Sequence, residues 1–160
     1  MFFGGPTFTA IHVAISLAGI LSGFVVLFAM LSGRRPAGWT ALFLSTTVAT
    51  SVTGFLFPFH RFLPAHATGI VSLPVLALAI YAFYSRHLAG GWRRTYVITA
   101  ALAQYLNVFV LVVQSFEKAS ALHALAPTQS EPPFLAAQLL VLALFVVLTV
   151  AADRRFRNLS

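Results

Sequence analysis

The hydrophobic residues of this chain fall into five long segments that are separated by short polar gaps. A segment of about 20 apolar residues is long enough to cross the roughly 30 Å hydrocarbon layer of a membrane as an α-helix. Because lipid offers the backbone no hydrogen-bond partners, we expect each segment to be helical along its length. The pattern therefore predicts one all-α domain, an integral membrane helical bundle of five transmembrane helices over 1–160, with spans at about 7–31, 39–57, 67–84, 95–116 and 133–152.

The composition agrees with a membrane protein and excludes several other classes. Hydrophobic residues make up 59% of the sequence and charged residues 8%, whereas a soluble domain carries roughly a quarter charged residues. The chain has no cysteine, which excludes disulfides, thiolate catalysis and iron–sulfur ligation. The net charge of +7 does not indicate nucleic-acid binding, because the basic residues lie in small groups at segment ends. The expected partner is the lipid bilayer.

The basic residues are divided unequally between the two sides of the predicted membrane. Arg61 and Lys118 lie on one side, and eight arginines lie on the other: Arg34, Arg35, Arg86, Arg93, Arg94, Arg154, Arg155 and Arg157. The positive-inside rule places the larger group in the cytoplasm, with the N-terminus outside and the C-terminus inside. The N-terminus lacks the basic region of a cleavable signal peptide. We therefore expect a multi-pass protein of the bacterial inner (plasma) membrane whose outer side faces the periplasm.

Small residues recur on the first two segments at helical spacing. Ser16, Gly19 and Gly23 follow one face of the first segment, and Thr50 and Gly54 follow one face of the second. Small side chains allow two helix backbones to approach closely in lipid. We expect the first two helices to pack against each other through these faces.

Uncharged amides form a stripe along the fourth segment. Gln104, Asn107 and Gln114 are separated by three and seven residues, which places them on one helix face, and Glu117 follows them. Gln138 lies in the fifth segment. Amides are costly in lipid unless they form hydrogen bonds, so they should face the interior of the bundle. Two interpretations remain open: hydrogen bonds that join helices, and a polar cavity that opens to the periplasm.

Most of the histidines and acids lie on the predicted outer side. His12 and His66 are the candidate metal ligands, with Glu117 and Glu131 as acidic neighbours and His60 and His123 in the same layer. Neutral imidazoles with a carboxylate can bind a metal ion, and two imidazoles can hold a haem. The sequence contains no H-x-x-x-H or H-E-x-x-H spacing, and no cofactor is required by it. The candidate ligand-binding residues are His12, His66, Gln104, Asn107, Gln114, Glu117, Glu131 and Gln138.

Two stretches, 105–114 and 125–134, resemble segments of a family of small polytopic inner-membrane proteins from proteobacteria. The stretch 47–59, with Gly54 and Pro58, fits the same family. The resemblance covers most of the chain and implies a bacterial membrane location. It implies no activity, because that family has no assigned biochemistry.

Three classes of function agree with these patterns, and an enzyme is disfavoured because no nucleophile elbow, phosphate loop or dinucleotide motif occurs. The favoured class is an accessory or interaction protein that packs in a homo-oligomer or a larger membrane complex and presents a polar surface to the periplasm. The alternative is a binding or redox module that holds a metal, haem or quinone at the outer face. The third class is a small transporter component with a path past Gln104, Asn107 and Pro74, the proline being expected to kink its helix.

Overall fold

The computed structural model describes residues 5–57 and 64–157. Five of its helices are long and apolar enough to cross a membrane, which indicates a multi-pass membrane protein. The predicted all-α bundle with five candidate spans is thus confirmed, and the described residues form no strand. In chain order the elements are α1 (Pro6–Leu31), α2 (Ala37–Leu56), α3 (Pro64–Ile80), the π-helical segment η1 (Tyr81–Ser85), α4 (Trp92–Lys118), α5 (Ser120–Leu125) and α6 (Pro132–Arg157).

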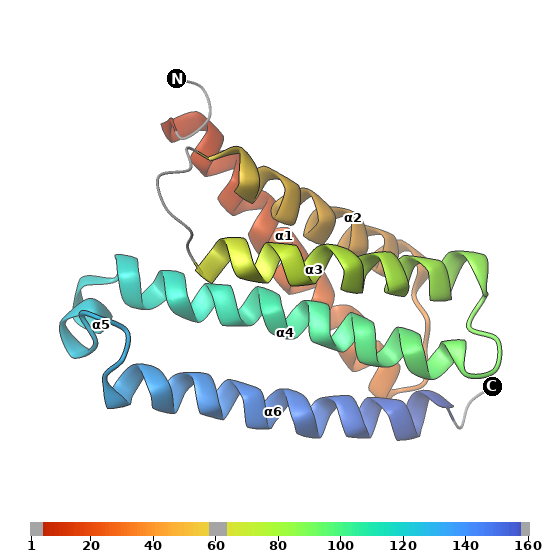
Figure 1. The fold of residues 1–160 in the computed structure, drawn as a ribbon. Coiled ribbons are helices and arrows are strands. Elements are labelled where there is room, and N and C mark those ends of the chain that lie inside the picture. The colour runs from red at the N-terminus through yellow and green to blue at the C-terminus, as the bar shows by residue number, and fades with distance from the viewer. Residues whose placement is uncertain (1–4, 58–63, 158–160) are drawn as a thin grey trace.

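The long helices run up and down, so alternate connections lie at the same end of the bundle. Figure 1 shows the α1–α2 and α3–α4 connections and the end of α6 at one end, and the start of α1 and the short helix α5 at the other. We call the first end the basic end, because Arg34, Arg35, Arg93, Arg94 and Arg154 belong to it. We call the opposite end the α5 end. The arginines that the sequence places in separate connections therefore lie together at one end of the bundle.

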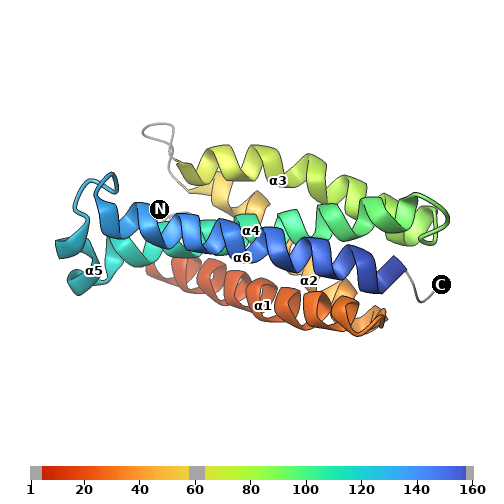
Figure 2. The same ribbon diagram turned by 90° about the horizontal axis from the view of Figure 1, so that it is seen from below.

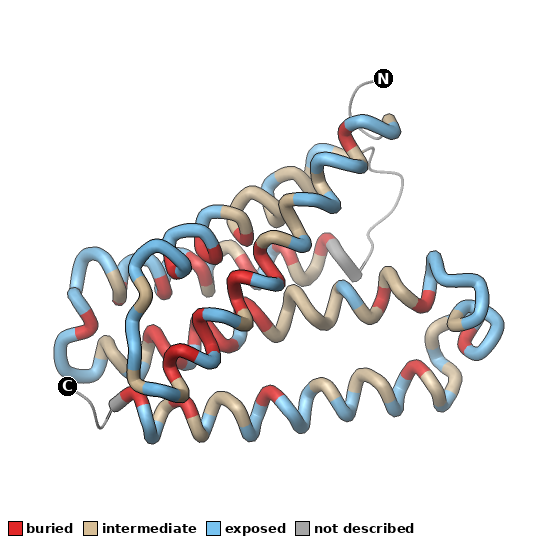
Figure 3. Tube along the Cα trace, turned by 180° about the vertical axis from the view of Figure 1, so that it is seen from behind, coloured by how far each residue is buried: buried red, intermediate tan, exposed pale blue. Residues whose placement is uncertain are grey.

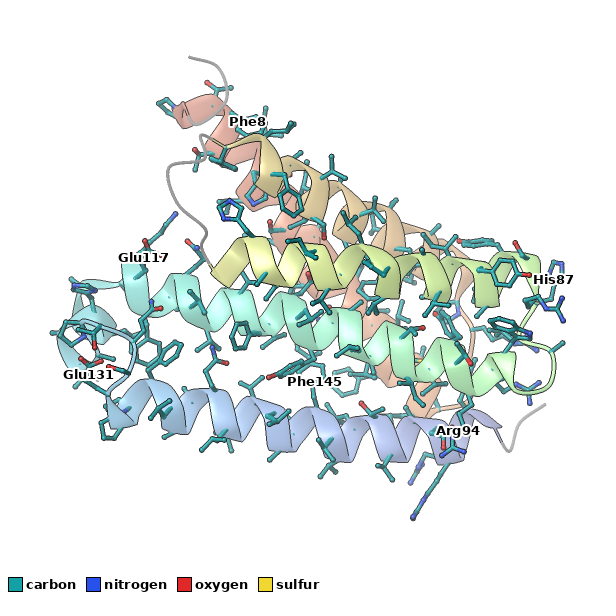
Figure 4. The ribbon with its side chains drawn as sticks, viewed as in Figure 1. Phe8, His87, Arg94, Glu117, Glu131 and Phe145 are labelled. Carbon is teal, nitrogen blue, oxygen red and sulfur yellow. The ribbon has the colours of Figure 1, made fainter. Side chains whose placement is uncertain are left out.

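Helix α4 is the centre of the bundle. It contacts α1, α3 and α6, while α1 packs along α2, and Figure 2 shows α4 directly behind α6 with α3 and α1 on either side. Small residues on the inner faces of α4, namely Ala100, Ala101 and Ala103, are buried and permit these close approaches. Phe145 of α6 points toward α4 (Figure 4) and packs against Tyr105 and Phe24. These contacts join α1, α4 and α6.

The outside of the bundle is apolar, as expected for a surface that faces lipid. Leu21, Leu140 and Val147 are 66%, 72% and 64% exposed. Figure 3 shows the buried residues concentrated on the inward sides of the helices. In the most apolar window of α6 only 17% of the residues are buried, against 50% in α4. Helix α6 is therefore the peripheral helix of the bundle.

Several helix boundaries differ from the sequence prediction. Helix α6 extends to Arg157 rather than 152, and α4 begins at Trp92 rather than 95. Hydropathy marks only the apolar part of a helix, whereas backbone hydrogen bonding continues into residues whose charged ends reach water. As a result Asp153 lies on a helix. The short helix α5 and the wide turn at η1, where the Arg86 N–H donates to the Tyr81 carbonyl, were not predicted.

Candidate functional site

Gln104 is the most deeply buried of the predicted site residues. Its side chain is 1% exposed, and its Nε2 donates to the backbone oxygen of Ile20 in α1 at 2.7 Å. Gly23 makes room for this amide, because a Cβ at Gly23 would overlap the Gln104 side chain and lie 2.9 Å from the ring of Phe43. The second glycine of the predicted small-residue face thus accommodates a side chain of α4.

Asn107 extends this polar contact to α2. Its Nδ2 lies 3.2 Å from the hydroxyl of the buried Thr47 and 3.4 Å from Oε1 of Gln104. Ile20, Gly23, Thr47, Gln104 and Asn107 together form what we call the amide cluster. The cluster connects α1, α2 and α4 in the interior of the bundle, as the stripe on the fourth segment suggested.

The stripe leaves the interior toward the α5 end. Asn107 is half-buried, Leu111 is exposed, and Gln114 is half-buried without a hydrogen bond in the described part of the chain. Figure 1 shows the reason: α1 and α2 cross α4 at an angle and diverge from it toward the α5 end. The spacing of the amides correctly predicted which face of α4 meets α1 and α2. It did not predict how far along α4 the other two helices cover that face.

Two of the predicted packing residues, Gly19 and Gly54, lie between α1 and α2. A Cβ at Gly19 would meet the hydroxyl oxygens of Thr46 and Thr47 at 3.2 Å, a tight contact, whereas one at Gly54 would have ordinary contact with His12 at 3.8 Å. The hydroxyls of Ser16 and Thr50 instead donate to carbonyls of their own helices, those of His12 and Thr46.

Two glutamine side chains, one in the loop before α6 and one in α6 itself, donate to carbonyls on consecutive turns of α4. Nε2 of Gln138 donates to the carbonyl of Phe109 at 3.3 Å, and Nε2 of Gln129 donates to that of Val113 at 3.0 Å. Oε1 of Gln138 is buried and has no hydrogen-bond partner among the described residues. Sequence reasoning identified Gln138 and missed Gln129, which lies in a loop with a positive φ of 61° and has no distinguishing pattern around it.

His12 is held by α2. Its Nδ1 lies 2.6 Å from the hydroxyl oxygen of Thr53, and its ring meets that of Phe57 edge-on at 5.1 Å. The Thr53 hydroxyl donates to the Ala49 carbonyl at 2.7 Å, so Nδ1 of His12 is best assigned as the donor to Thr53. The imidazole therefore closes the α1–α2 contact near the α5 end, with Nε2 left as its acceptor atom.

His66 lies near the start of α3, where it is 6% exposed and its ring is 6.0 Å from that of Phe55. His60 lies outside the described residues. No group of three His, Cys, Asp or Glu side chains that could hold a metal ion occurs among residues 5–57 and 64–157. The metal or haem site at the outer face stays a prediction.

The two outer acids are in different surroundings. Figure 4 shows Glu117 projecting from the end of α4 and Glu131 in the loop before α6. Glu131 accepts hydrogen bonds from the hydroxyl of Thr128 at 2.6 Å and from the backbone N–H groups of Thr128 and Ser130. These bonds, chiefly that of the Thr128 hydroxyl, hold the pKa of Glu131 below its usual value of 4.5. Glu131 therefore lies immediately before α6, where its carboxylate bonds the loop that leads into this helix.

An ion pair that sequence reasoning did not anticipate joins α4 to α6 at the basic end. Nε of Arg94 lies 3.5 Å from Oδ2 of Asp153, whose side chain is only 13% exposed. Oδ1 of Asp153 is buried without a partner among the described residues. Arg94 and Asp153 also line a hollow of about 320 Å³ between the two helices. The predicted fifth span ends at 152, one residue before Asp153, whereas α6 continues to Arg157.

The fold and the amide cluster define a class, a multi-pass membrane bundle whose interior polar groups bond one helix to another. A comparison of the chain with protein families, curated proteins and solved structures found no match.

Proposed function

We propose that this chain is a small accessory or interaction protein of a bacterial inner membrane, with no reaction of its own. The observation that carries the proposal is the amide cluster. Gln104 and Asn107 are the polar groups best placed for a ligand within the bilayer, and both donate to groups of neighbouring helices. Amides that bond other helices stabilise a bundle rather than bind a substrate.

We further propose that the basic end faces the cytoplasm, with the N-terminus in the periplasm. Support comes from the arginines at the α1–α2 and α3–α4 connections and at the end of α6. Positively charged loops are retained on the cytoplasmic side during insertion. The resemblance of 105–114 and 125–134 to proteobacterial inner-membrane proteins agrees with this location.

Helix α6 is the proposed contact surface for a second copy of the chain or a larger membrane complex. It is the least buried of the five spans, and Leu140 and Val147, seven residues apart, lie exposed on one face. Helices associate in lipid mainly through close van der Waals packing. A partner can therefore form the most new contacts on the helix that the rest of the bundle covers least.

Photo-crosslinking in native membranes tests this proposal. A photo-reactive residue in place of Leu140 or Val147 should give a discrete product, either a dimer or a complex with one other protein. The same residue in place of Leu21, which is equally exposed on α1, is the matched control and should give little product. Products from all three positions alike, or from none, would contradict an interaction surface on α6. An absorption band of bound haem or quinone in the purified protein would favour the binding-module alternative instead.

A further inference from the structure

A second hollow, of about 660 Å³, lies at the basic end where α1 turns into α2. One wall is apolar and consists of Val25 and Phe28 of α1 together with Trp39 of α2. All three are exposed, at 38%, 53% and 48%, so this wall continues into the lipid-facing surface of the bundle. The hollow therefore opens both to lipid tails and to the headgroup region at the ends of the spans.

The hollow also has a strongly basic side. Arg34 and Arg35 line it, both are exposed, and neither pairs with an acid in the described part of the chain. Only three acids occur in the sequence, and Glu117 and Glu131 lie at the α5 end, while Asp153 pairs with Arg94. Two adjacent guanidinium groups without a counter-charge attract an anion, and their planar N–H groups match the geometry of a phosphate.

The backbone holds these arginines in place. Gly33 adopts a left-handed φ of 72°, and the N–H groups of Gly33 and Arg34 donate to the carbonyls of Met30 and Ala29. This is the Schellman arrangement that ends a helix with a fixed turn. Pro36, which also lines the hollow and is the N-cap of α2, has its own φ fixed by its ring and restricts the backbone of Arg35 before it. The basic side of the hollow is thus preorganised rather than a flexible tail.

The first turn of α2 adds further positive potential. Its N-cap residue, Pro36, provides no side-chain cap, and the first helical hydrogen bond runs from the Thr40 N–H to the Pro36 carbonyl. The N–H groups of the residues between them have no partner within the helix. Uncapped N–H groups at a helix start favour an anion, and here they lie beside the two arginines.

We infer that this hollow binds one anionic phospholipid of the surrounding leaflet. The phosphate lies between Arg34, Arg35 and the start of α2, and an acyl chain lies along Val25 and Phe28. Trp39 sits at headgroup depth, where indole rings prefer to be. Free phosphate would use only the basic side and leave the apolar wall without a function, whereas a phospholipid matches both. This inference does not depend on the proposed function or on which end of the bundle faces the cytoplasm.

Binding of phosphatidylglycerol to the full chain in nonionic detergent, followed by native mass spectrometry, tests the inference. We expect one tightly bound phosphatidylglycerol per chain and much weaker binding of zwitterionic phosphatidylcholine. Arg34→Gln with Arg35→Gln should weaken phosphatidylglycerol binding about 30-fold, which corresponds to about 1 kcal/mol for each lost charge. Arg154→Gln with Arg155→Gln removes the same charge from the same end and should leave binding within about threefold of the parent.

A third variant separates the hollow from its charge. Ser32 lines the hollow and is exposed, so Ser32→Phe fills part of the space while both arginines remain. It should weaken phosphatidylglycerol binding, because the lipid no longer fits between the apolar wall and the two arginines. Equal losses in the two arginine pairs, unchanged binding in Ser32→Phe, or displacement of the lipid by millimolar inorganic phosphate would each overturn the inference. The first would indicate diffuse charge attraction, and the last a phosphate site.

Discussion

At the scale of the residue, Gly23 is the position at which the packing of the bundle is most tightly determined. Alanine is favoured over glycine within a helix by roughly 0.5–1 kcal/mol. At Gly23, however, a Cβ would displace the Gln104 amide from its bond to Ile20 and press on Phe43. Gly23→Ala should therefore destabilise the bundle, by about 1–3 kcal/mol as overpacking usually does. Thermal unfolding in detergent measures this, and Gly38→Ala, where a Cβ meets nothing within 4 Å, is the control.

The same contact predicts a coupling between two residues. In a Gln104→Ala background the overlap with Gly23 is removed, so Gly23→Ala should lose most of its cost. Gln104→Ala alone removes one interhelical hydrogen bond, worth about 0.6 kcal/mol on average, as well as buried packing. If the two substitutions were simply additive, the Gly23–Gln104 contact would not explain the effect at Gly23.

Glu131 predicts a dependence of stability on pH. Its pKa in the folded chain is lowered, mainly by the hydrogen bond from the Thr128 hydroxyl. The carboxylate therefore stabilises the fold above the usual value of 4.5, and this contribution is lost as pH falls through the lower folded value. Glu131→Gln should unfold at a lower temperature than the parent at pH 7, with the difference shrinking in acid. Glu117→Gln removes a carboxylate at the same end and serves as control; an unchanged difference between neutral and acid pH would contradict the role of Glu131.

At the scale of the element, the attachment of α6 to α4 depends on a partly buried charge. Arg94→Gln leaves the carboxylate of Asp153 without a counter-charge, and this should cost about 1 kcal/mol or more. Adding Asp153→Asn removes the charge itself, so the double variant should recover part of the loss. Unfolding temperatures of the two single variants and the double variant measure this. If the double variant is the least stable of the three, the ion pair does not hold α6 as described.

The long helices could be predicted because twenty apolar residues in lipid have few alternatives to a helix. The polar face of α4 followed from spacing alone, and two of its residues, Gln104 and Asn107, do lie together inside the bundle. Three features could not be predicted. Helix α5 and the loop residue Gln129 have no periodic pattern, and the burial of Asp153 depends on how α6 packs against α4.

At the scale of the whole molecule, the two ends differ in chemistry. The basic end holds an arginine-rich surface with two hollows, and the α5 end holds Glu117, Glu131 and local hydrogen bonds around them. Such a molecule has one orientation that the insertion machinery favours. Residue spacing does not specify this orientation, so its prediction depends on the arginines alone.

The measurement that tests the proposed orientation of the bundle most directly uses the absence of cysteine from the chain. Gly91→Cys places a thiol in the α3–α4 connection, where a Cβ meets nothing within 4 Å, and Ser120→Cys places one at the exposed start of α5. With a membrane-impermeant maleimide applied to spheroplasts, Ser120→Cys should be labelled at once and Gly91→Cys only after the membrane is opened. Labelling of Gly91→Cys in sealed spheroplasts would contradict this orientation, because the basic end would then face outward.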